Sequence, residues 1–431
     1  MKKVGMVGAG GAGFPSYAKL AEGADTLLVN GSECEPLLYT DYTILKRERD
    51  TVIDGIRAIL DAGAVSRALI CLKRHTAERL GYADGDTLAQ RITVKLLPDS
   101  YPIGDEISLI YEATGRVVKP GNLPITEGVI VYNVETLYNL GRAARYSEPV
   151  TETWLTVGGD VQRRAVIRVP VGTSVSHIFR TLGIKIKDTH AVLDGGPSMG
   201  KLIDPDIHKV TKTTKAILVL PKSSRAVEAK LINEKMAAAR AETACCQCTR
   251  CTDMCPRHLL GYPLEPHKMV RTAMQPATCM PKMIISATLC CGCGICESLA
   301  CSQGISPKAV INGYKVILAE NKLRYVAKEP TNARPEREYR MIPSAKWASA
   351  LGVKQYDAVP EYIEDFPLPT SVEIPMISHI GAPSIPTVRD GDEVRCGDEI
   401  ARAADGLSAP QYASIGGKVT VKGDKIRISK G

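Results

Sequence analysis

Cysteine placement constrains this 431-residue chain more than any other feature, because 11 of its 14 cysteines lie between Cys245 and Cys301. A small secreted domain stapled by disulfides spreads its cysteines through a short sequence, whereas this long chain gathers them in one window. Such clustering favours metal ligation in a reducing compartment. We therefore expect a cytoplasmic protein with a metal-binding region in its second half.

The window contains two runs of closely spaced cysteines. The first follows C-x2-C-x2-C-x3-C with Pro256 next, which is the spacing of bacterial-type [4Fe–4S] ligation, and the second is spaced x2, x2 and x4. One tight loop can cap three irons of a cubane, so the fourth thiolate must come from elsewhere. We predict two [4Fe–4S] clusters, one held by Cys245, Cys248, Cys251 and Cys301, and the other by Cys290, Cys293, Cys296 and Cys255.

Structural zinc is the alternative for this window, but zinc sites usually pair two C-x2-C units instead of using triplets. Cys246 and Cys291 lie beside predicted ligands at equivalent places in the two runs, and we expect both to be packed spectators. Cys279 falls between the runs and is expected to be a buried thiol.

Composition excludes several other classes of protein. The net charge of +8 comes from scattered residues, and only 5% of the chain is aromatic, so we expect no nucleic-acid surface. No window of 18 apolar residues is free of charge, which argues against a membrane-spanning helix. The opening MKKVGMVGAG has no long apolar stretch, and we expect no signal peptide there.

The chain changes character along its length. Up to about residue 148, strand-like stretches (4–7, 26–30, 68–72, 92–97 and 129–133) alternate with helix-like ones (17–22 and 43–62), which predicts an α/β layer with a mostly parallel sheet. A small α+β module follows, then a polar helix leading into the cysteines, a linker rich in proline and charge, and a small all-β domain. We place the boundaries at 1–148, 149–222, 223–327, 328–368 and 369–431.

Two loops of the first domain carry further signals. Residues 8–13 fit G-x-G-x-x-G between a predicted strand and a predicted helix, where glycines let backbone N–H groups approach a phosphate. A tight turn in an α/β core is the plainer alternative. The acidic loop 30–36, NGSECEP, follows the second predicted strand. Its carboxylates could hold ribose hydroxyls or simply be solvated turn residues.

Four motifs in one order carry a family resemblance: GAGGAGFP (8–15), NGSECEP (30–36), YPIGDE (101–106) and YNVET (132–136). They resemble the flavin- and NADH-binding subunit of respiratory complex I and, more closely, the RnfC protein of the Rnf electron-transport complex. The order of parts is similar to the cobalamin reductases of propanediol-utilisation microcompartments, in which a glycine-rich domain comes first and a barrel-sandwich domain last. In the RnfC protein, by contrast, that last domain lies at the N-terminus.

The resemblance implies a multidomain α/β and α+β protein. Its parts would be a Rossmann-like FMN- and NADH-binding domain over 1–148 and a ligand-binding β-grasp module of the SLBB type over 149–222. A helical two-cluster ferredoxin-like domain over 223–327 would follow, then a linker with a short helix over 328–368. A barrel-sandwich β domain over 369–431 would end the chain.

The resemblance also assigns cofactor-binding residues, all by contact with FMN or NADH and none with a catalytic role. The loop that approaches the flavin and the dinucleotide comprises Gly8, Gly10, Gly11 and Gly13, followed by Phe14, which would stack on NADH. The acidic loop contributes Asn30, Ser32, Glu33 and Glu35. The tyrosine-containing segment contributes Tyr101, Gly104, Asp105 and Glu106, and the flavin-phosphate side contributes Asn133 and Thr136.

Three departures from complex I affect the NADH side. Ser32 stands where complex I has an aspartate, and Ala9 stands where it has an arginine. No clear match is found for the lysine that follows the glycine loop in complex I.

The function implied is that of a flavin iron–sulfur oxidoreductase passing electrons from NADH through FMN and two [4Fe–4S] clusters to cob(II)alamin. It would reactivate a B12-dependent dehydratase. Expected partners are cobalamin, or a cobalamin-dependent enzyme or adenosyltransferase, and a shell protein of a bacterial microcompartment, within or attached to which the protein would lie. Two alternatives stay open: an Rnf-like protein docking a membrane complex, and a non-enzymatic cluster conduit bound to a shell protein.

Overall fold

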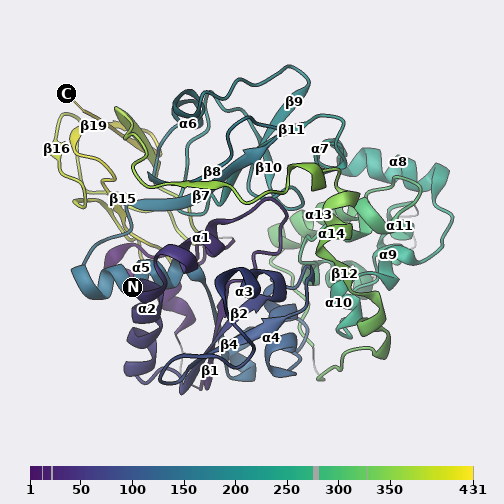
Figure 1. Ribbon diagram of the computed structural model, residues 1–431. Coiled ribbons are helices and arrows are strands. Elements are labelled where there is room, and N and C mark those ends of the chain that lie inside the picture. The colour runs from purple at the N-terminus through teal and green to yellow at the C-terminus, as the bar shows by residue number, and fades with distance from the viewer. Residues whose placement is uncertain (12, 21–22, 275–280, 328, 431) are drawn as a thin grey trace.

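The computed structural model describes residues 1–11, 13–20, 23–274, 281–327 and 329–430 (Figure 1). The expectation for Cys279 lies outside the described residues. Within these ranges, no helix has the length and apolar character needed to cross a membrane.

The N-terminal region is built on a five-stranded sheet with helices packed around it. The strand order is β3-β4-β2-β1-β6; β4, β2, β1 and β6 run parallel, whereas β3 pairs with β4 in the antiparallel direction. The mostly parallel sheet predicted from the sequence is confirmed. The strands are β1 (Thr26–Asn30), β2 (Arg67–Lys73), β3 (Thr87–Ala89), β4 (Ile92–Leu97) and β6 (Val129–Asn133). The helices are α1 (Thr40–Arg47), α2 (Arg49–Asp61), α3 (Arg74–Leu80), α4 (Glu106–Thr114) and α5 (Val134–Tyr146).

Two glycines let α2 and α5 pack backbone against backbone. A Cβ atom on Gly55 would lie 1.9 Å from the carbonyl oxygen of Leu137, and one on Gly141 would lie 1.9 Å from that of Thr51. Neither position therefore has room for a side chain. This close packing holds α5 against α2.

The first predicted strand is wrong. Residues Lys2–Val4 form a 3-10 turn, η1, and Val7 makes only an isolated bridge with Pro15. The predicted helix after the glycine loop is a short 3-10 turn, η2 (Ser16–Lys19), with residues 21 and 22 outside the described ranges. The glycine loop thus precedes the first strand of the sheet instead of connecting a strand to a helix. The predicted helix over 43–62 also divides at Glu48, into α1 and α2.

The second sheet has six strands in the order β10-β9-β11-β7-β8-β13. β7 and β8 form an antiparallel hairpin, α6 (Val175–Leu182) follows, and β11 returns to the centre of the sheet parallel to β7. A buried apolar cluster fills the space between the sheet and α6. The strands are β7 (Glu152–Gly159), β8 (Ala165–Pro170), β9 (His190–Asp194), β10 (Lys201–Ile203), β11 (Ala216–Pro221) and β13 (Glu361–Ile363).

The cysteine-rich region is made of short helices on one side of the molecule (Figure 1). They are α7 (Arg225–Leu231), α8 (Glu234–Ala244), α9 (Arg250–Asp253), α10 (Pro256–Leu259), α11 (Pro266–Met274), α12 (Pro281–Ile285) and α13 (Pro307–Glu320). A 3-10 turn, η5 (Ser286–Leu289), precedes the second cysteine run, and a π-helical turn, η6 (Cys296–Ala300), lies within it.

The segment expected to be a linker with a short helix also supplies strands to two sheets. β12 (Ile342–Pro343) pairs with β5 (Ser100–Tyr101) of the N-terminal region, and β13 extends the second sheet beside β8. Between them, α14 (Ser344–Ala350) carries the fully buried Trp347. Such short strands have no detectable alternation, so composition alone suggested a linker.

The C-terminal domain is entirely β-structure, as predicted. Its two sheets, ordered β14-β20-β19-β16 and β15-β17-β18, enclose their own apolar core. The strands are β14 (Ser371–Pro375), β15 (Ile385–Pro386), β16 (Glu393–Val394), β17 (Glu399–Arg402), β18 (Gln411–Tyr412), β19 (Gly417–Lys422) and β20 (Lys425–Ser429). The domain packs near the N-terminus, where the ammonium of Lys212 donates to the carbonyls of Gly5 (2.9 Å) and Pro410 (3.2 Å).

Candidate cofactor sites

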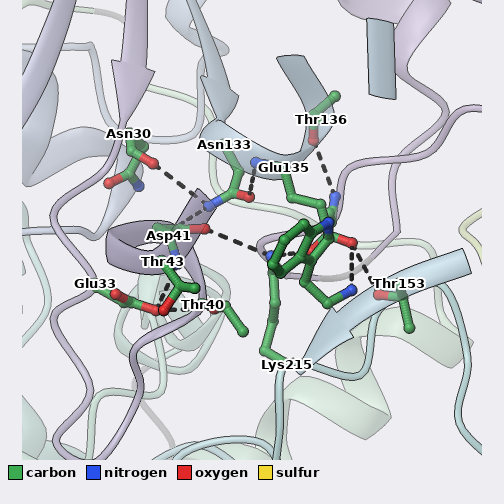
Figure 2. Close-up of polar contacts among 12 residues, drawn as sticks. Asn30, Glu33, Thr40, Asp41, Thr43, Asn133, Glu135, Thr136, Thr153 and Lys215 are labelled. Atoms are coloured by element: carbon green, nitrogen blue, oxygen red, sulfur yellow. Dashed lines mark hydrogen bonds and ion pairs between the residues drawn. The ribbon is translucent and has the colours of Figure 1, made fainter. Parts of the chain in front are cut away.

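Two asparagines mark the edge of the N-terminal sheet where a ligand would bind. Asn30 ends β1 and Asn133 ends β6, and the two are partners in the register of these parallel strands. The carboxyl ends of neighbouring parallel strands are where α/β sheets place their ligands. The glycine loop reaches the same edge, since the Ala9 N–H donates to Thr136 Oγ1 at 3.1 Å. The structure therefore brings the glycine loop, Asn133 and Thr136 together (Figure 2).

The backbone of the glycine loop presents donors at this edge. A Cβ on Gly10 would lie 3.0 Å from the Asn133 Cβ, so the loop fits closely over the strand end. Gly10 and Gly11 are exposed, and no described residue accepts a hydrogen bond from either N–H. Asn133 is also the N-cap of α5, where the helix dipole is positive. Free amides beside a helix N-terminus fit a phosphate group such as that of FMN.

The ends of the glycine loop are fixed by other contacts. The carbonyl of the half-buried Phe14 accepts the Gly8 N–H at 2.8 Å, which closes the loop. Gly13 has a left-handed φ of 70°, and its carbonyl accepts the Ile380 N–H of the C-terminal domain. The ammonium of Lys19, six residues after Gly13, lies 2.9 Å from Glu106. This pair ties the segment after the glycine loop to the first residue of α4.

Asn30 joins the acidic loop to the tyrosine-containing segment. Its side-chain amide donates to the Gly104 carbonyl at 2.9 Å, and its Oδ1 accepts the hydroxyl of the buried Ser32 at 2.7 Å. A Cβ on Gly104 would lie 2.4 Å from Ser32 Oγ, so only glycine fits there. Hydrogen bonds and close packing therefore connect three residues, Asn30, Ser32 and Gly104.

Glu33 uses its carboxylate to cap α1. One oxygen accepts the Thr40 hydroxyl and the Asp41 N–H, each at 2.8 Å, and the other accepts the Tyr42 N–H at 3.1 Å. Burial, and then the charge of Asp41, raise the pKa of Glu33 to about 7. The side chain expected to contact FMN or NADH is thus engaged within the protein (Figure 2).

Glu35 holds a loop of the second sheet. Its carboxylate accepts the Ser198 N–H at 2.9 Å and the Met199 N–H at 2.8 Å. Gly196 lies so close that a Cβ there would be 2.5 Å from the Glu35 carboxyl carbon. Like Glu33, Glu35 has protein partners for both carboxylate oxygens. A cofactor contact of Glu35, as predicted from the sequence, would have to compete with these hydrogen bonds.

A buried charge cluster lies behind Asn133 (Figure 2). Asp41 accepts the Asn133 side-chain amide at 2.7 Å and pairs with Lys215 at 3.6 Å, and Lys215 also pairs with Glu135. Glu135 in turn accepts the Trp154 N–H at 3.0 Å. Burial alone would lower the pKa of Lys215, but Glu135 and Asp41 raise it. The cluster orients the Asn133 side chain through Asp41 and joins the first domain to the second sheet through Glu135.

Sequence reasoning missed all three members of this cluster. Glu135 lies inside the YNVET motif, so its place in the motif was a usable signal. Asp41 and Lys215 belong to no motif, and only the fold brings them together.

The first set of predicted cluster ligands surrounds a cavity near the surface. Cys245, Cys248, Cys251 and Cys301 line about 400 Å³ of empty space, its open mouth included. Cys246 and Cys248 are exposed, so the expectation that the Cys246 side chain is packed is wrong, because the loop that carries it lies at the surface. Each described cysteine is a free thiol, and in the described ranges no three Cys, His, Asp or Glu side chains converge as they would on a single metal ion. The thiols ring a space, which fits a multi-iron group.

The second set surrounds a more deeply placed cavity. Cys255, Cys290, Cys293 and Cys296 line about 330 Å³, its mouth included, together with Cys291. Cys255, Cys293 and Cys296 are each less than a tenth exposed. Arg257 and Lys308 also line the cavity, and both side chains are largely buried. Cations beside thiolates suit a site that would hold a negatively charged cluster.

The tyrosine-containing segment connects the flavin side of the sheet to this second cavity. The hydroxyl of the buried Tyr101 donates to the Cys293 carbonyl at 2.7 Å, and its ring stacks on Trp347 with centroids 4.6 Å apart. Asp105, the N-cap of α4, pairs with Arg257 at 2.7 Å. Tyr101 and Asp105 were predicted as cofactor-binding residues, and the structure engages both side chains with the cysteine region.

Comparison with known proteins agrees with this division of the chain. Residues 1–142 match the family described as the Nuo51 FMN-binding domain. Residues 244–306 match the 4Fe-4S dicluster domain, and residues 353–427 match the RnfC barrel sandwich hybrid domain. A mixed α/β chain with an FMN-binding domain, a dicluster domain and a C-terminal barrel-sandwich domain is thereby confirmed.

Full-length relatives extend the comparison. The chain is 38% identical over 423 residues to "Cobalamin reductase PduS" of Citrobacter freundii, covering 97% of this chain and 93% of the relative. It is 37% identical to the protein of the same name from Salmonella typhimurium, with the same coverage. A component of the ion-translocating oxidoreductase complex of Rhodobacter capsulatus is 32% identical over 268 residues, which is 61% of this chain and 49% of that component. The chain therefore belongs to the family of the cobalamin reductases PduS.

Proposed function

We propose that this protein is an NADH-dependent flavin iron–sulfur oxidoreductase that carries two [4Fe–4S] clusters and reduces cob(II)alamin. The observation that carries the proposal is the direct link between the two candidate sites. Asp105, in a motif of the flavin-binding domain, pairs at 2.7 Å with Arg257, which lines the second cysteine cavity. Joining the two kinds of site on one chain suits the conversion of a two-electron donor into single electrons.

In this proposal the N-terminal domain supplies binding and orientation. The free amides of Gly10 and Gly11 and the N-terminus of α5 would hold the FMN phosphate. Asn133, oriented by Asp41, would lie beside them, and the partly buried Phe14 would offer an aromatic face to NADH. Bound FMN supplies hydride acceptance and single-electron release, which no amino-acid side chain provides.

The other parts of the chain have proposed roles as well. We propose that residues 149–222 form a β-grasp module of the SLBB type, which the hairpin, helix and central parallel strand β11 support. The relatives named cobalamin reductase support cobalamin, or an enzyme that uses it, as the partner. Their name also supports action within or attached to a propanediol-utilisation microcompartment, in contact with a shell protein, where a B12-dependent dehydratase would be reactivated.

An Rnf-like role is the second candidate. The match of residues 353–427 to the RnfC barrel sandwich hybrid domain favours it, because that domain is shared with a component of a larger electron-transport complex. Stoichiometric co-purification of the native protein with membrane proteins of such a complex would support this role, and its purification without them would support the cobalamin reductase.

An anaerobic NADH titration of iron-reconstituted protein tests the main proposal, with flavin analysis and low-temperature EPR on each sample. We expect the flavin to bleach first and two reduced-cluster signals to follow. Retained clusters that NADH does not reduce, in protein that holds no flavin, would contradict the proposal and favour a cluster conduit.

Thr136→Val tests the flavin site itself. The variant removes the acceptor for the Ala9 N–H, so the glycine loop should loosen and flavin retention should fall, while both cluster signals stay unchanged. Thr114→Val is the matched control, because it removes a threonine hydroxyl that donates to the Ile110 carbonyl and accepts the Arg116 N–H, away from the glycine loop. Equal flavin retention in the two variants would remove Thr136 from the site.

A further inference from the structure

The two cysteine cavities differ in how far they are enclosed. The rim of the first cavity is exposed at Cys246, Gln247 and Cys248 on one side and at Ser302 and Gln303 on the other. The ligand cysteines of the second cavity are mostly buried, with Cys255, Cys293 and Cys296 each below a tenth exposed. The first cavity therefore has exposed residues of its own ligand loop at its mouth, whereas the cysteines lining the second are half-buried at Cys290 and Cys291 and otherwise buried.

The second cavity is also the one fixed to the flavin-binding domain. Tyr101 donates to the Cys293 carbonyl, and Arg257 on its wall pairs with Asp105. Trp347, stacked on Tyr101, donates through Nε1 to Ser198 Oγ at 2.9 Å, and Ser198 is held by Glu35 of the acidic loop. A continuous set of buried contacts thus runs from the acidic loop to the wall of the second cavity.

The two cavities are neighbours. Cys255, four residues after Cys251 in the first run, lines the second cavity, and Cys301, five residues after Cys296 in the second run, lines the first. Each cavity would therefore receive its fourth cysteine from the other run. The helix α9, which carries Cys251, also contacts the turn η6, which begins at Cys296. Figure 1 shows α8, which leads into the first cavity, at the far side of the molecule from β1.

We propose that the two sites act in a fixed order. The buried site of Cys255, Cys290, Cys293 and Cys296 is the inner site, positioned against the flavin-binding domain by Tyr101 and Arg257. The exposed site of Cys245, Cys248, Cys251 and Cys301 is the outer site, where an external one-electron acceptor is reduced. NADH supplies two electrons by losing a hydride on the flavin-binding side, and the two electrons would then pass one at a time between the sites with no bond formed or broken. Two one-electron acceptors would be reduced for each NADH oxidised. This inference rests on the proposed function and adds the route and the docking surface.

Single cysteine variants distinguish the order. In Cys248→Ser, NADH should still reduce the inner cluster at the wild-type rate, as followed by rapid-freeze EPR. In Cys290→Ser, the outer cluster should still be reducible by dithionite, but its reduction by NADH should slow by about tenfold or more, a barrier increase of roughly 1.4 kcal/mol. An outer cluster reduced by NADH at the wild-type rate in Cys290→Ser would overturn the order.

Tyr101→Phe tests the same assignment without touching a ligand. Hydrogen bonds around a cluster tune its reduction potential, so loss of this hydroxyl should shift the inner cluster's EPR signal and lower its potential. The outer signal should not move. Tyr132→Phe is the matched control, because its buried hydroxyl donates at 2.6 Å to the Ser16 carbonyl, outside the cysteine loops. A shift of the outer signal alone would overturn the proposal.

The docking surface has its own test with cob(II)alamin as the acceptor. Gln303→Trp places a bulky ring on the rim of the outer cavity, and we expect slower cob(II)alamin reduction with unchanged reduction of both clusters by NADH. Gln355→Trp, at an exposed position in another part of the chain, should change neither rate. Unchanged cob(II)alamin reduction in Gln303→Trp would overturn the outer-site assignment.

Failure of this inference is distinguishable from failure of the proposed function. Wild-type clusters that NADH never reduces would contradict the proposed function, whereas the Tyr101→Phe potential needs only a chemical reductant. The Tyr101→Phe potential therefore tests whether the site of Cys255, Cys290, Cys293 and Cys296 is the inner site, whether or not NADH reduces the clusters.

Discussion

The two cysteine cavities are built from the same C-x2-C-x2-C unit, yet their surroundings differ. One has an exposed ligand loop at Cys246 and Cys248, while the other is lined mostly by buried cysteines and is bonded to the flavin-binding domain through Tyr101 and Arg257. Because the two predicted ligand sets are alike, the cavities differ in burial and in neighbouring dipoles and charges, and these factors tune the reduction potential of an iron–sulfur cluster. The comparison teaches that the rest of the fold can give two copies of one cysteine motif different surroundings, and the proposed order of the two sites rests on this difference.

The largest expected effect comes from breaking the buried pair between Arg257 and Asp105, whose side chains are each 12% exposed. Arg257→Met leaves the Asp105 carboxylate unpaired and should destabilise the protein by about 3–5 kcal/mol. Iron should be lost from the inner site before the outer one, as measured by EPR during thermal unfolding. Arg91→Met, which breaks an exposed pair with Asp61, is the control and should cost only about 0–1 kcal/mol.

Glu33 should contribute a pH dependence of stability on the flavin side. The pKa of Glu33 is raised to about 7 in the folded protein from an ordinary value of 4.5. The folded state then binds more protons than the unfolded state between these values, so stability should fall as pH rises from about 4.5 to 7. We expect a loss on the order of 2 kcal/mol, less than the full shift because solvent still reaches the side chain.

Glu33→Gln should flatten this dependence. Unfolding monitored at several pH values from 5 to 8 would show it, while the EPR signals of both cysteine sites stay the same. A variant that keeps the wild-type slope would assign the pH dependence to another group.

Trp347→Phe should have a smaller effect, directed to the inner site. The variant keeps a ring against Tyr101 but loses the bond to Ser198 Oγ and part of the buried volume. We expect a destabilisation of about 1–2 kcal/mol, with faster iron loss from the inner site when a chelator is added. Faster iron loss from the outer site would contradict the assignment of Trp347 to the inner site.

The smallest effect is expected at Cys246. Its thiol is exposed on the outer rim, so Cys246→Ser should leave iron content and both EPR signals unchanged. Cys248→Ser, two residues away, should remove the outer signal. Loss of a cluster in Cys246→Ser would mean that Cys246 is a cluster ligand.

The sequence predicted those features that depend on local spacing. The strands β1 and β6 and the two sets of cysteines follow from short-range patterns, because strand periodicity and the reach of a cubane are local constraints. The glycine loop was recognised from its sequence, but the strand expected before it, from Val4 to Val7, does not form. That segment is too short to pair along a sheet.

Partners that come from distant segments could not be predicted. Glu35 bonds to Ser198 and Met199, more than 160 positions away, and Tyr101 bonds to Cys293 across 192 positions. The carboxylates of Glu33 and Glu35 looked available for a ligand only because their protein partners were invisible in the local sequence. Lys215 likewise gains its role only when the second sheet packs on α5.

The most direct test of the route is selective removal of the outer cluster from wild-type protein. Limited anaerobic treatment with an iron chelator should strip the exposed site first, leaving one cluster signal. We predict that NADH reduces this remaining cluster at the wild-type rate while cob(II)alamin reduction is lost. A remaining cluster that NADH no longer reduces, or cob(II)alamin reduction that survives, would contradict the order of inner and outer sites.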